Sequence, residues 1–470
     1  MIALLSPPNN FDSMTYHMAR VAEWIQHQNV KFYPTAIPRQ NYSPPLAEYA
    51  ILHLQILSKS DFFANLVQWS SYIIAIILSS LIVRELKVSK LCQIVTSLIT
   101  ATIPMLILQS TSTQNDLVAG VFCLSFAYYL LKLEDLTSWE NSFFVSLSLG
   151  LALLTKGTSY IYCASIGLII GGSILLLKNQ DRIKVIIRFT LIIMFALFLN
   201  SGFYFRNIDL YRHPLSTAVD RITNDNLSLS VVYSNLVRNG AMHLATPFPE
   251  INDSLNQTVV SLLGASLNSS EATFEGSEFQ AKFLINGDYS GNAIHSLLIG
   301  FASLLLLFKR GSTKRYTYYF QATIVTSIVF YCILIKWQPW GTRLHIPVFL
   351  MGSILVGMLI DRLSIPKVSL AVFVTGMFVF SIPYLLFNNT RPLVPILKPE
   401  SSVRQEKLFL YTANKIDKFL RKRPEFDENL SSIKQLFYED QSILRMERNN
   451  LYYLSNFDYY LDYSEVARIF

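Results

Sequence analysis

The sequence predicts an all-α polytopic membrane protein. Three observations support this prediction: the composition, the mean hydropathy and the alternation of apolar and polar stretches along the chain. Hydrophobic residues make up 51% of the 470 residues and charged residues only 15%, whereas soluble domains contain about 25% charged residues. The mean hydropathy is +0.35. Ten apolar stretches alternate with polar connections. This pattern is typical of a chain that crosses a bilayer repeatedly.

Each apolar stretch predicts one membrane helix, because about 20 apolar residues are needed to cross a bilayer. In chain order the stretches are Phe62–Val83, Leu91–Leu108, Leu117–Leu131, Phe143–Leu154, Tyr160–Leu177, Val185–Phe205, Ile294–Phe308, Tyr318–Ile335, Leu344–Ile360 and Val368–Phe387. Phe143–Leu154 is short for a span and needs a thinned bilayer or burial by its neighbours. Val185–Phe205 contains Arg188, which we place near a helix end where its head group reaches water.

The connections between the stretches predict the orientation, since Lys and Arg concentrate in short cytoplasmic loops. One alternate set holds 14 Lys and Arg: 84–90, 132–141, 178–188, 309–315 and 361–367. The short loops of the other set, 109–115, 155–159 and 336–343, hold 3. The first set is therefore expected inside and the second outside, together with the long segments 206–290 and 388–470.

This orientation also places the segment before Phe62 outside, although Met1–Leu5 is too short to span a bilayer. We therefore expect Met1–Leu5 to be the outer end of a first transmembrane helix that is missing here, and the C-terminal module to be incomplete. The predicted organisation is a first outer loop (1–61), membrane helices (62–205), a large outer loop (206–290), membrane helices (291–387) and a small outer tail (388–470). Within the tail, Leu408–Leu420 and the aromatic run Tyr452–Tyr463 predict an α or α/β module.

Cysteines and net charge exclude other classes. Cys92, Cys123, Cys163 and Cys332 all fall inside apolar stretches without CxxC spacing, which indicates buried packing residues and no disulfide framework. The net charge of +7 arises largely in the loops expected inside. It reflects membrane topology and gives no reason to expect nucleic-acid binding.

The first outer loop predicts two short helices at the membrane surface. Apolar residues recur at helical spacing from Asp12 to Ile25, with His17, Arg20 and other polar residues between them, as in an interfacial amphipathic helix. After Pro44-Pro45 a second helix is expected over Leu46–Leu57.

Several motifs resemble bacterial GT-C glycosyltransferases related to the protein O-mannosyltransferases and aminoarabinose transferases. They are Pro7-Pro8-Asn9-Asn10-Phe11-Asp12-Ser13-Met14-Thr15-Tyr16-His17, Thr113-Gln114-Asn115-Asp116-Leu117-Val118-Ala119-Gly120, Leu154-Thr155-Lys156-Gly157-Thr158, Arg206-Asn207 with Leu210-Tyr211, and Trp337-Gln338-Pro339-Trp340-Gly341-Thr342-Arg343-Leu344-His345. The resemblance covers about residues 1–388. It implies a GT-C-like transmembrane bundle, an acid in the first outer loop, a polyprenyl-phosphate-linked sugar donor, and hexosyl or pentosyl transfer at the outer face of the bacterial inner membrane. The acceptor would be a glycan, a lipid or a protein.

Two acids are the catalytic candidates, because glycosyl transfer needs a base for the acceptor hydroxyl. Asp12 is the predicted base, and the alternative is an N-cap of the helix that follows. Asp116 opens an apolar stretch and is expected to orient the acceptor or tune Asp12; an acid favoured there by the helix dipole is equally open. We expect both acids to face one outward cavity. A divalent ion between them is compatible with the sequence, although no cluster has metal-ligand spacing.

Four cations at the predicted outer face are candidates for the donor phosphate: Arg343, Lys156, Lys336 and Arg206. A guanidinium fork fits phosphate geometry, whereas anchoring or snorkelling at the interface is the alternative for each. His17 and Glu48 are acceptor-side candidates, with a solvated polar face as the alternative. A polysaccharide ligase or polymerase that uses the same carriers stays open as an alternative function. A transporter is disfavoured because its charges usually lie near mid-membrane.

Overall fold

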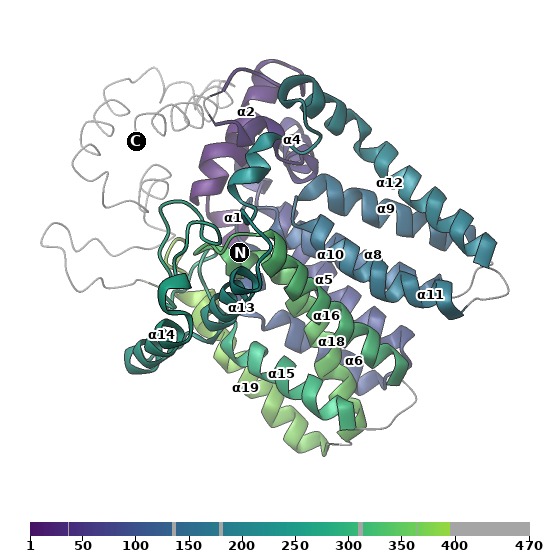
Figure 1. Ribbon diagram of the computed structural model, residues 1–470, viewed down its shortest axis with the longest axis vertical. Helices are drawn as coiled ribbons and strands as arrows, with labels where there is room; N and C mark the ends of the chain where they lie inside the picture. Colours follow the sequence, from purple (N-terminus) through teal and green to yellow (C-terminus); the bar gives the residue numbers. More distant parts are fainter. Residues whose placement is uncertain (36, 134–137, 178–181, 309–313, 364, 395–470) are drawn as a thin grey trace, which may run out of the picture. The chain divides into compact units, whose positions relative to one another are not determined.

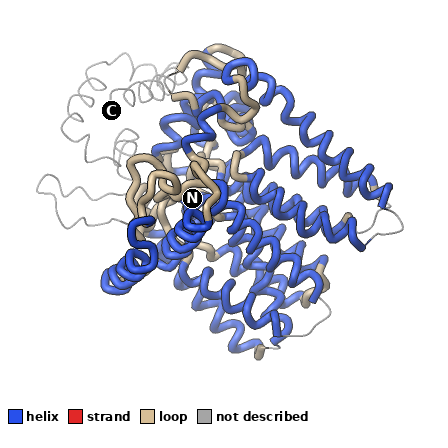
Figure 2. Tube along the Cα trace, viewed as in Figure 1, coloured by secondary structure: helices blue, strands red, loops and turns tan. Residues whose placement is uncertain are grey.

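The computed structural model describes residues 1–394, except 36, 134–137, 178–181, 309–313 and 364. Among these residues helices are the only extended regular structure and no strand is formed (Figure 2). Isolated bridges join Thr223 to Ile335 and Thr273 to Trp337. The all-α prediction is confirmed, whereas the predicted C-terminal module over Leu408–Leu420 and Tyr452–Tyr463 lies outside the described residues.

The α-helices are numbered in chain order, and Figure 1 labels most of them. They are α1 Ile2–Leu5, α2 Met18–Gln26, α3 Arg39–Tyr42, α4 Leu46–Ser58, α5 Leu66–Glu85, α6 Lys90–Ala101, α7 Pro104–Gln109, α8 Asp116–Lys132, α9 Trp139–Thr155, α10 Ser159–Ile166, α11 Gly172–Leu177, α12 Arg182–Tyr211, α13 Leu229–Leu244, α14 Pro249–Leu263, α15 Ala293–Phe308, α16 Lys314–Leu334, α17 Gly341–Leu344, α18 Ile346–Leu363 and α19 Lys367–Leu386. Short π-helical turns span Ser13–His17 and Gly167–Gly171.

The chain divides into two compact units. Of the described residues, the first unit contains 1–70, 108–115 and 383–394, and the second contains 71–107 and 116–382. The first unit thus gathers the first outer loop, one later loop and the segment after α19. The second unit contains most of the apolar helices.

All ten predicted apolar stretches are helical, and six of the helices are by themselves long and apolar enough to cross a membrane. The six run over Asp61–Glu85, Ser159–Leu177, Arg182–Tyr211, Arg315–Leu334, Ile346–Leu363 and Lys367–Leu386. The prediction of one helix over Leu91–Leu108 is wrong, because the chain breaks between α6 and α7 just before Pro104, where proline disfavours helical geometry in the residue before it. For α8, α9 and α15, with 17, 17 and 16 residues, crossing stays a prediction.

Helix α18 forms the centre of the second unit. The apolar stretch of α18 is 83% buried within the protein, whereas those of the other five candidate spans are 22–44% buried. It packs against α6, α8, α15 and α16. Its glycines permit this close packing: a Cβ at Gly352 would lie 2.3 Å from Ile299 of α15, and one at Gly357 would lie 1.9 Å from Thr96 of α6.

Contacts within the second unit agree with the predicted grouping of the loops. The Ser89 amide donates to Asp361 at 3.1 Å, which joins loops 84–90 and 361–367 of the Lys- and Arg-rich set. Arg362 donates to Thr317 at 2.7 Å, near the start of α16. In the other set, the Tyr162 hydroxyl near loop 155–159 donates to the Leu344 carbonyl at 2.7 Å. Loops of one set therefore meet one another, while the side of the membrane stays a prediction.

Arg188 does not reach water, contrary to the snorkelling prediction. Helix α12 starts earlier than the predicted stretch, at Arg182, so Arg188 lies inside it and is 8% exposed. Its guanidinium donates to the Ser138 carbonyl at 3.1 Å and lies 4.4 Å from the Trp139 ring centroid, at the start of α9. The guanidinium is therefore bound by the Ser138 carbonyl that precedes α9 and by the Trp139 ring.

In the first unit the two predicted short helices are present as α2 and α4. Part of the polar face that was expected to be exposed to water is buried between them. The apolar residues of the first helix, Met14, Met18 and Val21, pack with Ile51 of α4 in a buried cluster. The solvated position expected for His17 is wrong, since His17 and Arg20 are 0% exposed, whereas the His27 side chain at the end of this helix is 58% exposed. A membrane-surface position for these helices stays a prediction.

Candidate active site

Asp12 stands at the start of the first-loop helix but does not cap it. The Ser13 amide donates to the Asn10 side chain at 2.7 Å, and the Asp12 carboxylate makes no capping hydrogen bond and has helical φ/ψ. The capping alternative for Asp12 is therefore wrong, because Asn10 performs that role. Asp12 is 6% exposed, so its carboxylate is held almost entirely within the protein.

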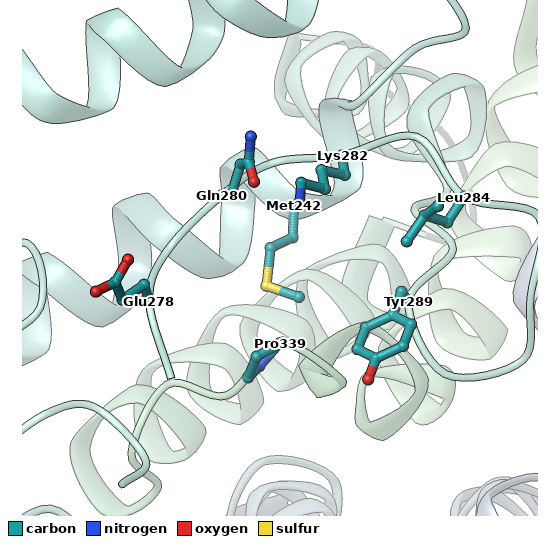
Figure 3. A pocket seen from close by; sticks show the side chains of 7 residues that line it. All are labelled: Met242, Glu278, Gln280, Lys282, Leu284, Tyr289 and Pro339. Carbon is teal, nitrogen blue, oxygen red and sulfur yellow. The ribbon is translucent and has the colours of Figure 1, made fainter. Parts of the chain in front are cut away.

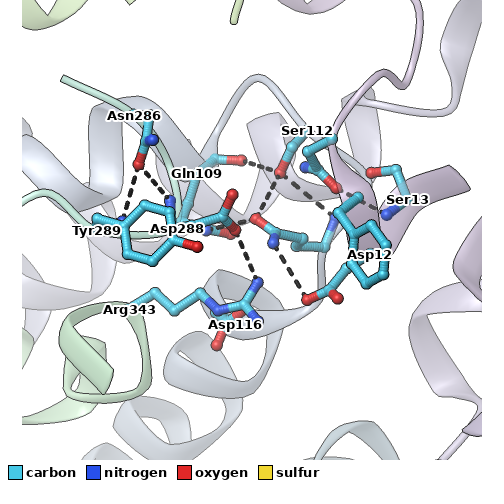
Figure 4. A network of polar contacts seen from close by, with 12 residues as sticks. Asp12, Ser13, Gln109, Ser112, Asp116, Asn286, Asp288, Tyr289 and Arg343 are labelled. Atoms are coloured by element: carbon cyan, nitrogen blue, oxygen red, sulfur yellow. Dashed lines mark hydrogen bonds and ion pairs between the residues drawn. The ribbon is translucent and has the colours of Figure 1, made fainter. Parts of the chain in front are cut away.

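Polar side chains of its own unit contact the Asp12 carboxylate. The Gln114 amide donates to Oδ2 at 3.4 Å, and the Arg39 guanidinium lies 3.7 Å from Oδ1. Glutamines continue from there: Gln109 donates to Gln114 at 2.6 Å, and Gln68 donates to Gln109 at 2.8 Å. Figure 4 shows part of this network around Asp12. Asp12 thus contacts the Gln114 amide, which belongs to a chain of hydrogen-bonded glutamines, and the Arg39 guanidinium.

The first-loop motif is also anchored to the segment after α19. Arg391 donates to the Asn9 side chain at 3.1 Å and to the Thr111 hydroxyl at 3.1 Å. Asn9 donates in turn to the Thr390 carbonyl at 2.9 Å. Sequence reasoning missed Arg391, since nothing local links it to a residue nearly 400 positions earlier.

His17, Glu48 and Arg20 form a buried polar cluster between α2, α4 and the first-loop turn. His17 Nδ1 lies 2.5 Å from Glu48 Oε1, and Arg20 Nη1 lies 3.8 Å from Glu48 Oε2. Burial acts to raise the pKa of Glu48, but the neighbouring His17 and Arg20 outweigh it and hold this pKa below its usual value. Since both side chains are 0% exposed, acceptor binding by His17 or Glu48 stays a prediction that would require this pair to open.

In the second unit, Asp116 pairs with Lys156. Asp116 begins α8 and is 2% exposed, and Lys156 Nζ directly after α9 lies 2.7 Å from its Oδ1. Apart from this ion pair, neither carboxylate oxygen accepts a hydrogen bond from the described residues. The structure thus brings the candidates Asp116 and Lys156 together. The pair is compatible with a role of Asp116 in tuning the base and equally with a buried ion pair that only stabilises the fold.

Arg343 pairs with an acid that sequence reasoning missed. Arg343 Nη1 donates to Asp288 Oδ1 at 3.1 Å, and the two side chains are 9% and 16% exposed. Asn286 fixes the turn that carries this acid, since its side chain accepts from the amides of Asp288 and Tyr289 at 3.1 and 2.9 Å (Figure 4). Such Asn turns mark loops with a defined conformation.

The remaining cation candidates lie in different surroundings. Lys336 Nζ lies 2.7 Å from Asp225, whose side chain is 52% exposed, so this pair stands near solvent. Arg206 does not end a helix as predicted, because α12 continues to Tyr211. The predicted loop 206–290 likewise contains α13 and α14.

His345 is not part of the positive charge near Arg343. Its Nδ1 lies 2.9 Å from Nε2 of His243. Burial lowers the pKa of His345 to about 4. Burial, and then the neighbouring His345, hold the pKa of His243 well below its usual value. Both imidazoles are therefore neutral at pH 7.

A cavity of about 230 Å³ opens in the second unit beside the Asn286 turn (Figure 3). It is lined by Met242, Glu278, Gln280, Lys282, Leu284, Tyr289 and Pro339. The extended segment before the turn alternates its side chains: Phe279 and Ala281 are buried, whereas Glu278, Gln280 and Lys282 are exposed and line the cavity. The lining thus combines the polar side chains of this segment with Met242, Leu284, Tyr289 and Pro339.

The predicted site residues therefore fall into separate groups. Asp12, His17 and Glu48 belong to the first unit, whereas Asp116, Lys156, Arg343, Lys336 and Arg206 belong to the second. A common cavity for Asp12 and Asp116 stays a prediction. The described residues contain no group of three or more His, Cys, Asp or Glu arranged to hold a metal ion. The four cysteines are buried and free, as predicted.

The comparisons with known proteins locate the similarity in the fold. No family model matches the sequence, and no curated protein is significantly similar to it. Among solved structures, the chain is similar to ArnT from Cupriavidus metallidurans bound to undecaprenyl phosphate, with a TM-score of 0.53 and 14% identity. It is also similar to the apo state of that protein, with a TM-score of 0.52 and 14% identity. In both comparisons the match covers 98% of this chain and 73% of the other.

At this identity the similarity concerns the fold alone: the chain has a fold similar to that of ArnT. Among the described residues six helices are long and apolar enough to span a bilayer, which makes the chain a multi-pass membrane protein.

Proposed function

We propose that this protein is a membrane glycosyltransferase that moves a hexosyl or pentosyl unit from a polyprenyl-phosphate donor to an acceptor hydroxyl. The observation that carries the proposal is Asp12, a nearly buried carboxylate that is not used as a helix cap, in a chain with the fold of ArnT. The solved ArnT structure contains undecaprenyl phosphate, which supports a lipid-phosphate donor here. The acceptor is a hydroxyl of a glycan, a lipid or a protein.

In the proposed reaction Asp12 takes the proton of the acceptor hydroxyl. The acceptor oxygen then forms a bond to the anomeric carbon of the sugar, while the bond from this carbon to the donor phosphate oxygen breaks. The phosphate leaves on its lipid carrier with the bonding electron pair, and cations stabilise the charge that develops on it. We assign this stabilisation to Arg343 and Lys156, with Lys336 and Arg206 as weaker candidates.

We place the reaction at the outer face of a bacterial inner membrane. This placement is supported by the asymmetry of Lys and Arg between the two loop sets. The proposed reaction needs no cofactor, because protein cations neutralise the phosphate. Loss of turnover on addition of a chelator would point instead to a divalent ion.

The test is Asp12→Asn in the purified full-length protein with a polyprenyl-phosphate sugar and a panel of acceptors. The substitution keeps the size of the side chain but removes the base, so turnover should fall roughly 10²–10⁴-fold with an unchanged melting temperature. Arg343→Ala should weaken donor binding as well as turnover, because it removes a charge-assisted phosphate contact.

Asp253→Asn is the matched control, because Asp253 is exposed on α14; it should leave turnover unchanged. Normal turnover in Asp12→Asn would overturn the base assignment. A long polymer formed from single-sugar donors would favour the alternative of a polymerase.

A further inference from the structure

Arg39 lies next to Asp12, and its side chain reaches the protein surface. It begins the short helix α3, its Nη1 is 3.7 Å from Asp12 Oδ1, and its guanidinium lies 5.3 Å from the Tyr16 ring centroid. The Arg39 side chain is 44% exposed, whereas that of Asp12 is 8% exposed. Arg39 therefore connects a buried carboxylate with the solvent.

The other candidate cations are bound more tightly by their own carboxylates. The ion pairs of Lys156, Lys336 and Arg343 measure 2.7, 2.7 and 3.1 Å, and these three side chains are only 9–16% exposed. The Arg39 pair is longer and its side chain more open. A guanidinium has five N–H donors in a planar fork. Arg39 can therefore keep one edge toward Asp12 and offer another edge to an incoming anion.

Arg20 fixes the backbone from which Arg39 projects. The fully buried Arg20 side chain donates to the carbonyls of Arg39, Asn41 and Ser43 at 3.1, 3.3 and 2.8 Å, and also to that of Gln40. The Gln40 side chain donates in turn to the Thr15 carbonyl at 2.7 Å. The turn is thus tied to the helix that carries Asp12, and the Arg39 backbone is held while its side chain stays exposed.

We propose that Arg39 binds the phosphate of the lipid-linked donor and bridges it to Asp12, with Arg20 as the positioning residue. This inference rests on the proposed function and deepens it. A carboxylate base and an anionic donor repel each other, so a cation between them lowers the cost of bringing them together. The planar fork suits this bridge, since it binds a carboxylate and a phosphate oxygen in one plane.

The experiment measures binding of undecaprenyl phosphate to the purified full-length protein in detergent, without turnover. Arg39→Gln should weaken the Kd roughly 10–100-fold, because it loses a charge-assisted contact. Arg39→Lys should recover part of this loss, since it keeps the charge without the fork. Arg221→Gln is the matched control: Arg221 is 71% exposed and paired with Glu275, and its Kd should not change.

The positioning role of Arg20 is tested by comparing the binding losses of the single variants with that of the double variant. Arg20→Lys keeps the buried charge but loses the donors that hold the turn, so it should weaken binding and shift KM more than kcat. If Arg20 acts through Arg39, the double variant Arg20→Lys, Arg39→Gln should bind no more weakly than Arg39→Gln alone. Additive losses would mean a general structural role and would overturn the positioning assignment.

The outcomes separate this inference from the proposed function. An unchanged Kd in a folded Arg39→Gln variant overturns the phosphate role of Arg39, even if Asp12→Asn is inactive. Asp12→Asn should retain or strengthen binding, since it removes a negative charge near the phosphate. Weak binding by Arg39→Gln together with normal turnover by Asp12→Asn would support Arg39 and reject Asp12 as base. Absence of binding by the unmodified protein would overturn both the donor class and the role of Arg39.

Discussion

At the scale of single residues, two buried acids of the described part of the chain are paired with cations without any substrate. Asp116 lies 2.7 Å from Lys156, and Asp288 lies 3.1 Å from Arg343. Pairing reduces the large cost of keeping an isolated charge out of water. Under the proposed function, a donor phosphate would have to compete with a carboxylate for each of these cations. Affinity for the donor would then depend on how readily each cation exchanges its carboxylate for the phosphate.

The His243–His345 pair predicts that acid destabilises the protein. With a pKa of about 4 in the folded state and about 6.5 when unfolded, His345 binds a proton more readily in the unfolded chain. Above pH 6.5 His345 is neutral in both the folded and the unfolded state. As the pH falls from about 6.5 to 4 the unfolded chain binds the proton first, so the free energy of unfolding decreases. This loss is on the order of 3 kcal/mol for His345.

Thermal unfolding in detergent across this pH range checks the prediction. His345→Asn should flatten the pH dependence of the melting temperature, whereas His213→Asn should not, because His213 is exposed. An equally steep dependence in both variants would contradict the assignment to the buried pair.

At the scale of elements, α13 holds the segment between α12 and α15 in place. Arg238 of α13 is fully buried and donates to Thr273, Asn235 and the Ala272 carbonyl at 2.7, 2.8 and 3.0 Å. Burial lowers its pKa to about 10, so it stays charged at pH 7. The end of α13 also meets Gly291, where a Cβ would lie 2.5 Å from the Met242 carbonyl oxygen. The backbone before α15 therefore passes the end of α13 without room for a side chain.

Gly291→Ala should destabilise the protein by about 1–3 kcal/mol, because the added methyl group meets backbone atoms that cannot rotate away. The melting temperature in detergent measures this effect. Gly300→Ala serves as the control: no atom lies within 4 Å of its added Cβ, so the control should be neutral or stabilising, as expected for alanine inside a helix. A Gly291→Ala variant as stable as the Gly300→Ala control would show that the backbone shifts without cost.

At the scale of the whole molecule, charge asymmetry predicts which loops face the cytoplasm. Reporter fusions should place loops 84–90, 178–188, 309–315 and 361–367 inside, because they belong to the set rich in Lys and Arg. Fusions within 336–343 should report the outer side. A reporter in loop 309–315 that is active only outside would overturn the orientation and, with it, the side on which transfer is proposed.

The class of fold and the helical stretches were predictable from the sequence, since composition and local periodicity alone decide them. The predictions failed where one residue or a neighbour altered the local pattern. Pro104 separates α6 from α7. His17 and Arg20 of the first-loop helix, which periodicity assigns to water, are buried against α4 and the turn at Arg39–Ser43. Periodicity shows that a face is polar, but not what covers it.

The sequence by itself determined the all-α membrane class, the helical nature of all ten apolar stretches, and Asp12 and Asp116 as the acids to consider, because these follow from residue type and near neighbours. Only the tertiary structure decided the partners of the charges. Arg39 beside Asp12, Asp288 beside Arg343 and Arg391 beside Asn9 are separated by 27, 55 and 382 positions in the chain. No local pattern records such pairs, since they form only when distant segments pack together and exclude the water that would otherwise screen each charge.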